Sequence, residues 1–336
     1  MRAAAGGERT LGRTPLRVSR LGLGLAAVGR PGYINLGRAR DLPAGRSPEA
    51  LAARVAELLD AAVATGIRYV DTARSYGRAE EFLAAWLAAR GPAADGLTIG
   101  SKWGYRYTAG WTVDAPVHEQ KELSPARFTQ QVAESRALLG ERLDLYEIHS
   151  ATAESGALGD ATLLRLLVER KQAGDYRAVG LTLTGADATR ALDLALEARV
   201  DGEPVFDVVQ ATFNCLEPSL ARPLACAHAA GLGVIAKEVF ANGRLTDAEA
   251  ARDPALAPLA ARARARGIAT DQLALAWVLE HPFVDCALSG AATTVQLSSH
   301  VAATAVSLDD EIRSAIRSVA EAPAAYWRRR GALPWS

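Results

Sequence analysis

The sequence is poor in cysteine, and this scarcity excludes two kinds of protein. Its 336 residues include only 3 cysteines, which form no CxxC pair. Because Cys215, Cys226 and Cys286 lie far apart, they fit neither a zinc site nor a disulfide framework. We therefore expect no metal and a reducing, cytoplasmic location.

The sequence also lacks an excess of charge and any long apolar run. Its 38 basic and 38 acidic side chains cancel, whereas nucleic-acid-binding domains usually carry a basic excess. No apolar stretch approaches the ~20 residues of a membrane span, and the first residues lack the apolar core of a signal peptide. We expect neither a nucleic-acid partner nor a membrane partner, and the sequence leaves the oligomeric state open.

What the sequence does contain is a regular alternation of short β-branched segments with longer amphipathic ones. Strands are predicted at residues 18–25, 67–71, 97–102, 143–149, 178–182, 206–210, 233–237 and 284–288. Helices are predicted at residues 49–65, from 79 onward, and at 125–139, 162–172, 186–198, 219–230, 271–280 and 294–304.

Eight such units favour an α/β fold of the (β/α)8 TIM-barrel type. A doubly wound sheet is the alternative, but its GxGxxG signature is absent, because Leu25, Ala26 and Ala27 follow Gly24. We expect a single domain over residues 1–336, with a C-terminal extension over residues 309–336 near the barrel mouth.

Four polar residues follow or end successive predicted strands. Asp71, Lys102 and His149 end three of them, and Tyr76 lies in the loop after the strand that ends at Asp71. Each could have a purely structural role, as a turn cap, a solvated lysine, a packed ring or a core histidine. Since strand ends of a barrel converge on one mouth, all four together predict an active site.

These four groups suit proton transfer to oxygen. A phenol has an ordinary pKa of about 10, and a neighbouring ammonium lowers it. We expect Lys102 to supply that cation, Asp71 to hold the lysine, and His149 to hydrogen-bond a substrate carbonyl. Tyr76 would then act as general acid or base while hydride moves at carbon.

Over residues 14–305 the chain resembles the aldo-keto reductase superfamily. The resemblance is carried by Asp71-Thr72-Ala73, Tyr76-Gly77, Ser101-Lys102-Trp103-Gly104, Ile148-His149, Val179-Gly180-Leu181-Thr182, Gln210, Asn214 and Ser289-Gly290-Ala291. It implies a (β/α)8 barrel that binds a nicotinamide cofactor, and a catalytic tetrad of Asp71, Tyr76, Lys102 and His149.

The resemblance also implies a cofactor site, in which this chain departs from the usual pattern. Thr182 and Leu183 replace a Ser-Asn pair, Lys237 replaces an aromatic ring, and Gln296 replaces an arginine. No Lys or Arg lies between residues 285 and 311, so NADP(H) and NAD(H) both stay open. The predicted cofactor contacts are Gly24, Leu25, Thr182, Gln210, Lys237, Ser289, Gly290, Ala291, Gln296 and His300.

Aromatic residues after the third strand and near the C-terminus suit a sugar, a flat ring or an apolar carbonyl compound. We predict substrate contacts from Trp103, Trp111 and Trp327. The leading hypothesis is an NAD(P)(H)-dependent oxidoreductase acting on a small-molecule aldehyde, ketone, sugar or alcohol. A nicotinamide-binding, redox-sensing barrel with little turnover is the alternative, and a barrel isomerase or lyase is a third.

Overall fold

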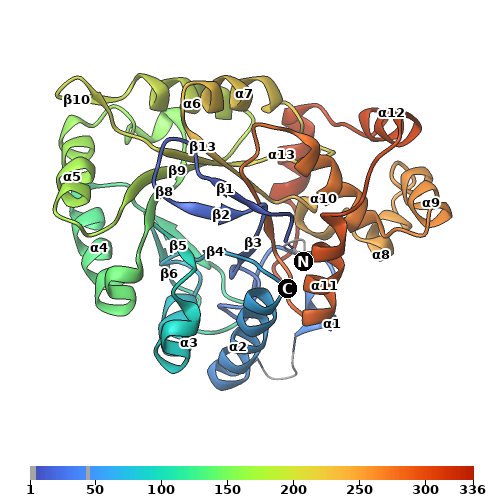
Figure 1. Cartoon of the computed structure of the whole chain (residues 1–336), viewed down its shortest axis with the longest axis horizontal. Helices are drawn as coiled ribbons and strands as arrows, with labels where there is room; N and C mark the ends of the chain where they lie inside the picture. Colours follow the sequence, from blue (N-terminus) through green and yellow to red (C-terminus); the bar gives the residue numbers. More distant parts are fainter. Residues whose placement is uncertain (1–4, 43–45) are drawn as a thin grey trace.

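The computed structural model describes residues 5–42 and 46–336. Eight parallel strands form a closed barrel, in the order β3, β4, β5, β8, β9, β12, β13 and β14, with helices around it (Figure 1). The strands are Leu21–Gly24, Tyr69–Asp71, Thr98–Trp103, Leu145–Ala151, Ala178–Leu183, Val208–Thr212, Gly233–Lys237 and Cys286–Ser289. The predicted fold is confirmed.

The barrel interior near the first residues of the strands is filled with apolar side chains. Tyr69, Leu145, Val208, Ile235 and Cys286 form one fully buried cluster with their neighbours. A barrel packed in this way is a solid core rather than a pore, so a ligand has room only at the open end of the strands.

The outer ring consists of helices whose apolar faces pack on the strands. They are α2 (Pro48–Ala64), α3 (Ala79–Arg90), α4 (Pro125–Leu139), α5 (Ala161–Gln172), α6 (Ala188–Glu197), α7 (Ala221–Ala229), α10 (Thr270–Glu280) and α11 (Thr294–Ala303). Ser124 caps α4, because its side chain accepts a hydrogen bond from Arg127 N. No helix in the described part of the chain has the length and hydropathy that a membrane span requires.

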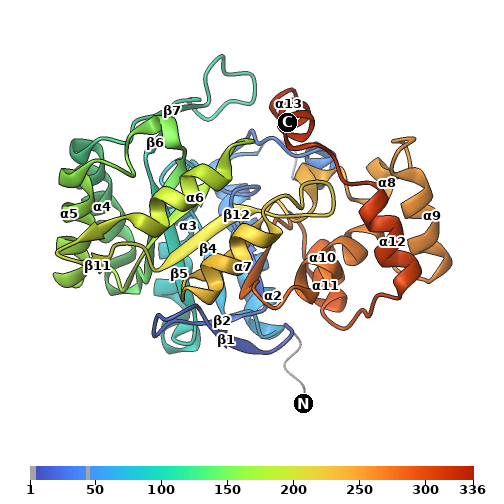
Figure 2. The same cartoon turned by 90° about the horizontal axis from the view of Figure 1, so that it is seen from above.

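Two hairpins lie at opposite ends of the barrel (Figure 2). β1 (Glu8–Thr10) and β2 (Arg17–Ser19) close the end below the strands, where Leu11 and Leu16 join the apolar cluster. β6 (Tyr105–Tyr107) and β7 (Glu119–Lys121) extend beside the other end. The first predicted strand was therefore too long, because residues 17–19 pair with β1 instead of the barrel.

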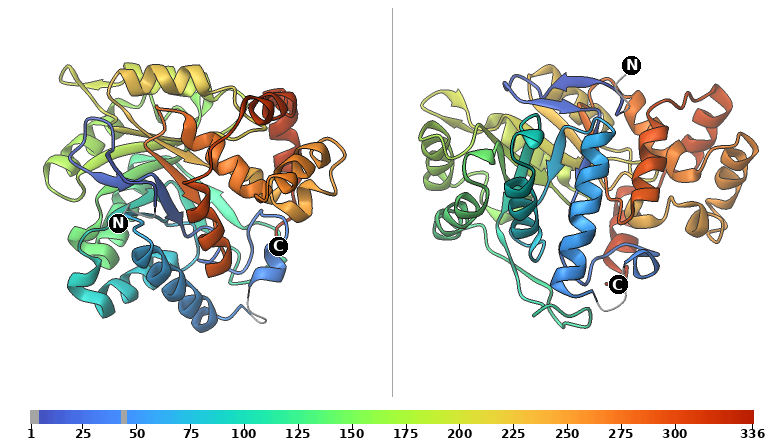
Figure 3. Two further views of the ribbon diagram at one scale, coloured as in Figure 1. Left: turned by 45° about the vertical axis from the view of Figure 1, so that its right-hand side comes forward. Right: turned by 60° about the horizontal axis from the view of Figure 1, so that its bottom comes forward.

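The segment before α10, where no helix was predicted, contains α8 (Asp247–Ala250) and α9 (Ala257–Ala265). Together with α12 (Asp310–Ser318) these helices build a second apolar core. Figure 3 shows the ribbon of these segments from two further sides. The short elements that remain are α1 (Arg38–Asp41), β10 (Arg199–Val200), β11 (Glu203–Pro204), η1 (Gly91–Ala94), η2 (Gly140–Arg142), η3 (Ala153–Ser155) and η4 (Ala241–Gly243).

The C-terminal extension crosses the open end of the barrel. α13 (Pro323–Gly331) follows α12, and residues from its end and beyond it line the pocket described below. The backbone of Ser336 exchanges two hydrogen bonds with that of Tyr33. Tyr33 is thus joined by backbone pairing to the C-terminus, a contact that no local sequence pattern predicts.

Candidate active site

Asp71 and Lys102 form a buried ion pair at the ends of β4 and β5. Lys102 Nζ lies 2.5 Å from Asp71 Oδ2, and the side chains are 0% and 3% exposed. The ammonium also donates to the Thr72 carbonyl at 2.9 Å. Both partners are thus held in fixed positions, and the lysine is held by Asp71 as the sequence led us to expect.

Tyr76 and His149 lie above this ion pair. Lys102 Nζ is 5.1 Å from the centre of the Tyr76 ring, and the rings of Tyr76 and His149 meet edge to face at 5.6 Å. Gly77, next in the chain, has φ of 63°, and a Cβ there would lie 2.6 Å from the Gly29 carbonyl oxygen. A glycine is therefore needed where the loop turns after the tyrosine.

The pKa of Tyr76 differs from the expectation. Burial and the charge of Asp71 raise it well above its ordinary value, where we expected Lys102 to lower it. The reason is that a phenolate loses its hydration here and has a carboxylate as well as an ammonium nearby. Burial and the charge of Lys102 lower the pKa of His149 well below its ordinary value. Near neutral pH the phenol keeps its proton and the imidazole is uncharged.

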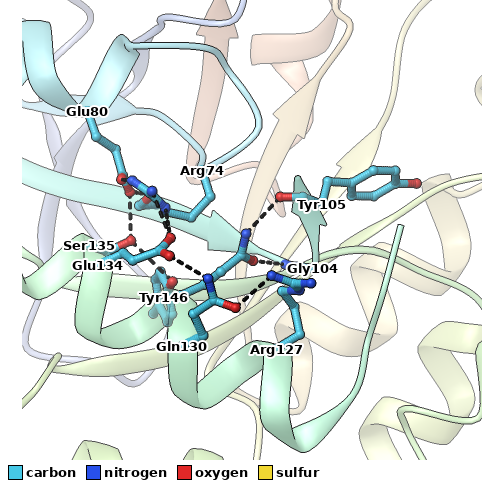
Figure 4. Close-up of polar contacts among 11 residues, drawn as sticks. Arg74, Glu80, Gly104, Tyr105, Arg127, Gln130, Glu134, Ser135 and Tyr146 are labelled. Carbon is cyan, nitrogen blue, oxygen red and sulfur yellow. Dashed lines mark hydrogen bonds and ion pairs between the residues drawn. The ribbon is translucent and has the colours of Figure 1, made fainter. Parts of the chain in front are cut away.

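A buried polar network holds the loop that connects β4 to α3 (Figure 4). The Arg74 guanidinium pairs with Glu80 and, at 2.8 Å, with Glu134. Glu80 Oε1 accepts hydrogen bonds from Ser101 Oγ at 2.5 Å and from Ser135 Oγ at 2.8 Å. Because three elements meet at this carboxylate, the loop has a fixed path. Sequence reasoning missed Glu80, since a glutamate in a first helical turn is usually solvated.

A pocket of about 380 Å³ opens at this end of the barrel. Asp71, Tyr76 and His149 line it, whereas Lys102 is buried behind them. Seven of the ten predicted cofactor residues also line it, namely Gly24, Gln210, Lys237, Ser289, Gly290, Gln296 and His300.

The other three predicted cofactor residues do not line the pocket, and their contact with a cofactor stays a prediction. Leu25 packs in the core, Thr182 Oγ1 accepts a hydrogen bond from the Ser150 backbone N–H, and Ala291 N donates to Ser289 Oγ. Thr184 lines the pocket instead of Thr182.

The end of the pocket near α11 is rich in carboxylates. His300 contacts Ser289 Oγ at 2.8 Å and Asp271 Oδ2 at 3.3 Å, with one ring nitrogen to each. Gln296 Nε2 donates to Asp41 Oδ2 at 2.8 Å. Both side chains are thus fixed by acidic partners, and the position of the expected arginine carries an amide.

The end of the pocket near β13 carries the opposite charge. Arg330 of α13 binds Glu238 through Nε at 2.9 Å and through a terminal nitrogen at 2.5 Å. Lys237 Nζ donates to Thr212 Oγ1 at 3.1 Å. Burial alone would raise the pKa of Glu238, but Arg330 and Lys237 together lower it to about 2. Glu238 is therefore a carboxylate, and it ties the C-terminal helix to the barrel.

The three tryptophans predicted to contact a substrate do not line the pocket, and their role stays a prediction. Trp103 is fully buried 5.1 Å from the Phe128 ring, Trp111 packs on Phe82, and Trp327 packs on Tyr326. Their apolar faces complete the cores around the barrel, with Trp103 fully buried and Trp111 and Trp327 partly exposed.

Other aromatic and charged residues take that place. Tyr33, Tyr105 and Trp335 line the pocket together with Arg30 and Glu119. The guanidinium of Arg30 lies 5.0 Å from the Trp335 ring, 5.4 Å from the Tyr76 ring and 2.5 Å from Glu119 Oε1. Of these residues, the sequence pattern pointed only to Tyr105 and Trp335, as aromatic residues after the third strand and near the C-terminus, because the five residues come from four separate segments of the chain.

Comparisons with known proteins agree with this geometry. The profile of the Aldo/keto reductase family matches residues 20–321. The chain is 31% identical over 215 residues to the D-threo-aldose 1-dehydrogenase of a Pseudomonas species, covering 58% of this chain and 62% of that protein. It is 26% identical over 341 residues to the NADH-specific methylglyoxal reductase of Escherichia coli, covering 93% and 98%.

A solved structure shows the same fold. The holo form of an aldo-keto reductase from Bacillus halodurans is 22% identical, with a TM-score of 0.70 over 94% of this chain and 96% of that one.

Proposed function

The chain belongs to the aldo/keto reductase family, and we propose that it transfers hydride between NAD(H) and a small hydroxylated carbonyl compound, with Tyr76 as proton donor. The family and its reductase relatives make the protein an NAD(P)(H)-dependent oxidoreductase. The proposal adds the proton donor, the preferred cofactor and the substrate class. The observation that carries it is the position of Tyr76 against His149 and above a buried ion pair of Asp71 and Lys102. Burial, which raises the pKa of the phenol and lowers that of the imidazole, agrees with it.

The pocket residues fit a nicotinamide cofactor, which when bound supplies or accepts the hydride. The Oδ1 atom of Asn242 is buried without a partner, so it is free to accept from a hydroxyl group. Lys237 has three donors and one hydrogen-bond acceptor among the described residues, which leaves N–H groups for an anion. Gly290 has no atom within 4 Å of a Cβ placed on it, so a ligand could approach its backbone closely.

The acidic end of the pocket supports NAD(H) over NADP(H). A 2′-phosphate needs charged donors, and Gln296 with its partner Asp41 offers an amide and a carboxylate. Among the described residues that line the pocket, the Arg and Lys side chains are Arg30, Lys237 and Arg330, which surround the opposite end. A relative that is named for its NADH specificity adds weight.

Each residue of the tetrad then has a task. Tyr76 gives its proton to the substrate oxygen, and the nearby Lys102 ammonium stabilises the phenolate that forms. His149, uncharged because its pKa is lowered, donates an N–H to the same oxygen. Asp71 keeps the ammonium in place.

The pocket mouth supports a hydroxylated substrate. Arg30 and Glu119 supply donors and acceptors beside the flat faces of Tyr33 and Trp335, a mixture that suits a sugar or a short hydroxycarbonyl. The names of two relatives, an aldose dehydrogenase and a methylglyoxal reductase, point to small carbonyl compounds of this kind.

The test begins with titrations of the protein with NADH and with NADPH, followed by turnover assays with aldoses and short hydroxycarbonyls. We expect NADH to bind at least about tenfold more tightly than NADPH, since a 2′-phosphate would find no charged donor at Gln296. Tyr76→Phe should lower kcat by about 10²- to 10⁴-fold with NADH binding unchanged.

Tyr176→Phe is the matched control. The Tyr176 hydroxyl donates to the Leu167 carbonyl, far from the pocket, so this variant should turn over like the wild type. Wild-type kcat in Tyr76→Phe would refute the assigned proton donor. Tight cofactor binding with no turnover on any substrate would favour the redox-sensing alternative.

A further inference from the structure

One buried carboxyl group next to the tetrad has no part in the mechanism above. Glu147 lies on β8, two residues before His149, and is 0% exposed. Its Oε2 accepts a hydrogen bond from Gln210 Nε2 at 3.2 Å, and the same amide donates to Asp71 Oδ1 at 2.8 Å. One amide therefore connects this carboxyl group to the catalytic ion pair.

The barrel is shaped to hold this side chain inside. Gly180 faces it from β9, and a Cβ at that position would lie 2.8 Å from Glu147 Cγ. The absence of a side chain on β9 makes the space that the carboxyl group occupies. A glutamate buried in a strand of this kind is costly unless it is paired or protonated.

No cation is paired with Glu147 among the described residues. Its Oε1 atom is buried without a partner, and its only hydrogen bond comes from the neutral amide of Gln210. Lys102 gives its short contacts to Asp71 and to a backbone carbonyl instead. An unpaired buried carboxyl group favours its protonated form.

The charged and titratable groups around Glu147 come from three other strands. Asp71 and Tyr69 belong to β4, Lys102 to β5 and Lys237 to β13. Burial raises the pKa of Glu147, Lys102 lowers it, Asp71 raises it and Lys237 lowers it, which brings it to about 8.

We propose that Glu147 is a positioning residue that keeps a proton on its carboxyl group, so that Asp71 is the only carboxylate beside Lys102 and Tyr76. The inference rests on the proposed function of the site. The protonated group fixes Gln210, and through Gln210 the oxygen of Asp71 that Lys102 does not use.

Loss of this proton would act on Tyr76 through charge. A second carboxylate in the barrel would compete for the Lys102 ammonium and disfavour the phenolate that forms when Tyr76 gives up its proton. Reduction should therefore slow as the pH rises through the pKa of Glu147. Glu147→Gln keeps the shape and the acceptor oxygen of the side chain but cannot ionise. The variant therefore stays in the uncharged state at every pH.

The first experiment compares pH profiles of kcat for carbonyl reduction. We expect kcat of the wild type to fall by about tenfold between about pH 7 and pH 9.5, and kcat of Glu147→Gln to fall by less than about threefold. Near pH 7 the variant should keep at least about one third of wild-type kcat. Identical profiles, or a folded Glu147→Gln that is inactive at pH 7, would overturn the proposal.

Glu217→Gln is the matched control. Glu217 is also a buried glutamate with one unpartnered oxygen, but it lies outside the pocket. This variant should keep the wild-type profile. A lost alkaline limb in this control as well would overturn the assignment to Glu147.

The second experiment needs no turnover and uses the cofactor-free protein with 13C-carboxyl glutamate. Wild type and Glu217→Gln should show a glutamate carboxyl resonance that titrates near pH 8 and is missing from Glu147→Gln. Titration of that resonance in the ordinary carboxyl range, about pH 4, would overturn the proposal. If it titrates near pH 8 and no substrate is turned over, the proposed function fails while the protonated Glu147 stands.

Discussion

Two buried glutamates at the mouth of the barrel have opposite charge states. Glu147, on β8, is 0% exposed and has a pKa raised to about 8, whereas Glu238, after β13, has a side chain 7% exposed and a pKa lowered to about 2. Burial pushes both values upward. The difference arises because Glu238 has a bidentate guanidinium from Arg330, whereas Glu147 has one neutral amide.

The comparison shows that the two halves of the site are built for different purposes. Beside Glu147, Lys102 gives its short contacts to Asp71 and a backbone carbonyl, and we propose that the ion pair of Asp71 and Lys102 thereby controls the proton of Tyr76. Around Glu238 charge is abundant and serves to attach the C-terminal helix next to Lys237. The same residue type thus adjusts proton transfer in one place and fixes a boundary of the pocket in the other.

The largest expected effect comes from breaking the ion pair itself. Lys102→Met leaves the Asp71 carboxylate buried without its cation, which should lower the free energy of unfolding by about 3–5 kcal/mol and kcat by at least about 10²-fold. Urea denaturation and steady-state assays measure the two. Lys171→Met, which breaks a partly exposed pair with Asp207, should cost only about 1 kcal/mol. Equal losses of stability in the two variants would show that the buried pair of Asp71 and Lys102 stabilises the fold no more than the partly exposed pair does.

The next test replaces Glu147, the glutamate with the raised pKa, by a glutamine that cannot ionise. The folded protein keeps a proton on Glu147 up to about pH 8, whereas the unfolded chain releases it near pH 4. Above that lower value the unfolded state binds fewer protons, so wild-type stability falls as the pH rises to about 8. Glu147→Gln should therefore gain several kcal/mol over wild type on going from pH 4 to pH 9, as measured by urea denaturation at each pH. A constant difference between the two proteins would contradict the comparison.

The lowered pKa predicts the opposite sign. Glu238 is ionised in the folded protein down to about pH 2, so its contribution is complete above about pH 5 and is lost as the pH falls toward 2. Between wild type and Glu238→Gln we expect a difference of roughly 3 kcal/mol near neutral pH that shrinks in acid. Thermal unfolding at a series of pH values measures it. A difference that grew in acid would mean that Arg330 does not hold the carboxylate.

The smallest effect concerns the two tryptophans of the C-terminal extension. Trp335 lines the pocket and stacks on His118 at 3.8 Å, whereas Trp327 lies outside it. Trp335→Leu should raise KM for the carbonyl substrate by about tenfold, and Trp327→Leu should change KM by less than about twofold. Equal increases of KM in the two variants would indicate that Trp327 also contacts the substrate.

Much of the fold could be predicted from the sequence, because strand and helix periods are local signals. α4 and β13 have the predicted bounds, and most other elements differ by a few residues. The three-residue strands of the hairpins were missed, since so few residues show no period. The helices of the segment before α10 were not predicted. They pack in a second apolar core that also contains residues of α12.

The four residues of the predicted tetrad meet at one end of the barrel, whereas the three tryptophans predicted to contact a substrate do not line the pocket. Asp71, Lys102 and His149 are placed by the ends of strands, and parallel strands bring their ends together whatever the loops do. The tryptophans depended on the loops and on the tail. Trp103 and Trp111 are near the pocket in sequence, but their side chains found apolar neighbours elsewhere.

The sequence by itself determined the barrel and the four polar groups at its mouth, because spacing along the chain decides both. Only the tertiary structure decided how those groups are charged. The phenol of Tyr76 keeps its proton through burial, and Glu238 loses its own through Arg330, which is 92 residues away in the chain. Protonation depends on which distant residues share a dry interior, and no local pattern records that.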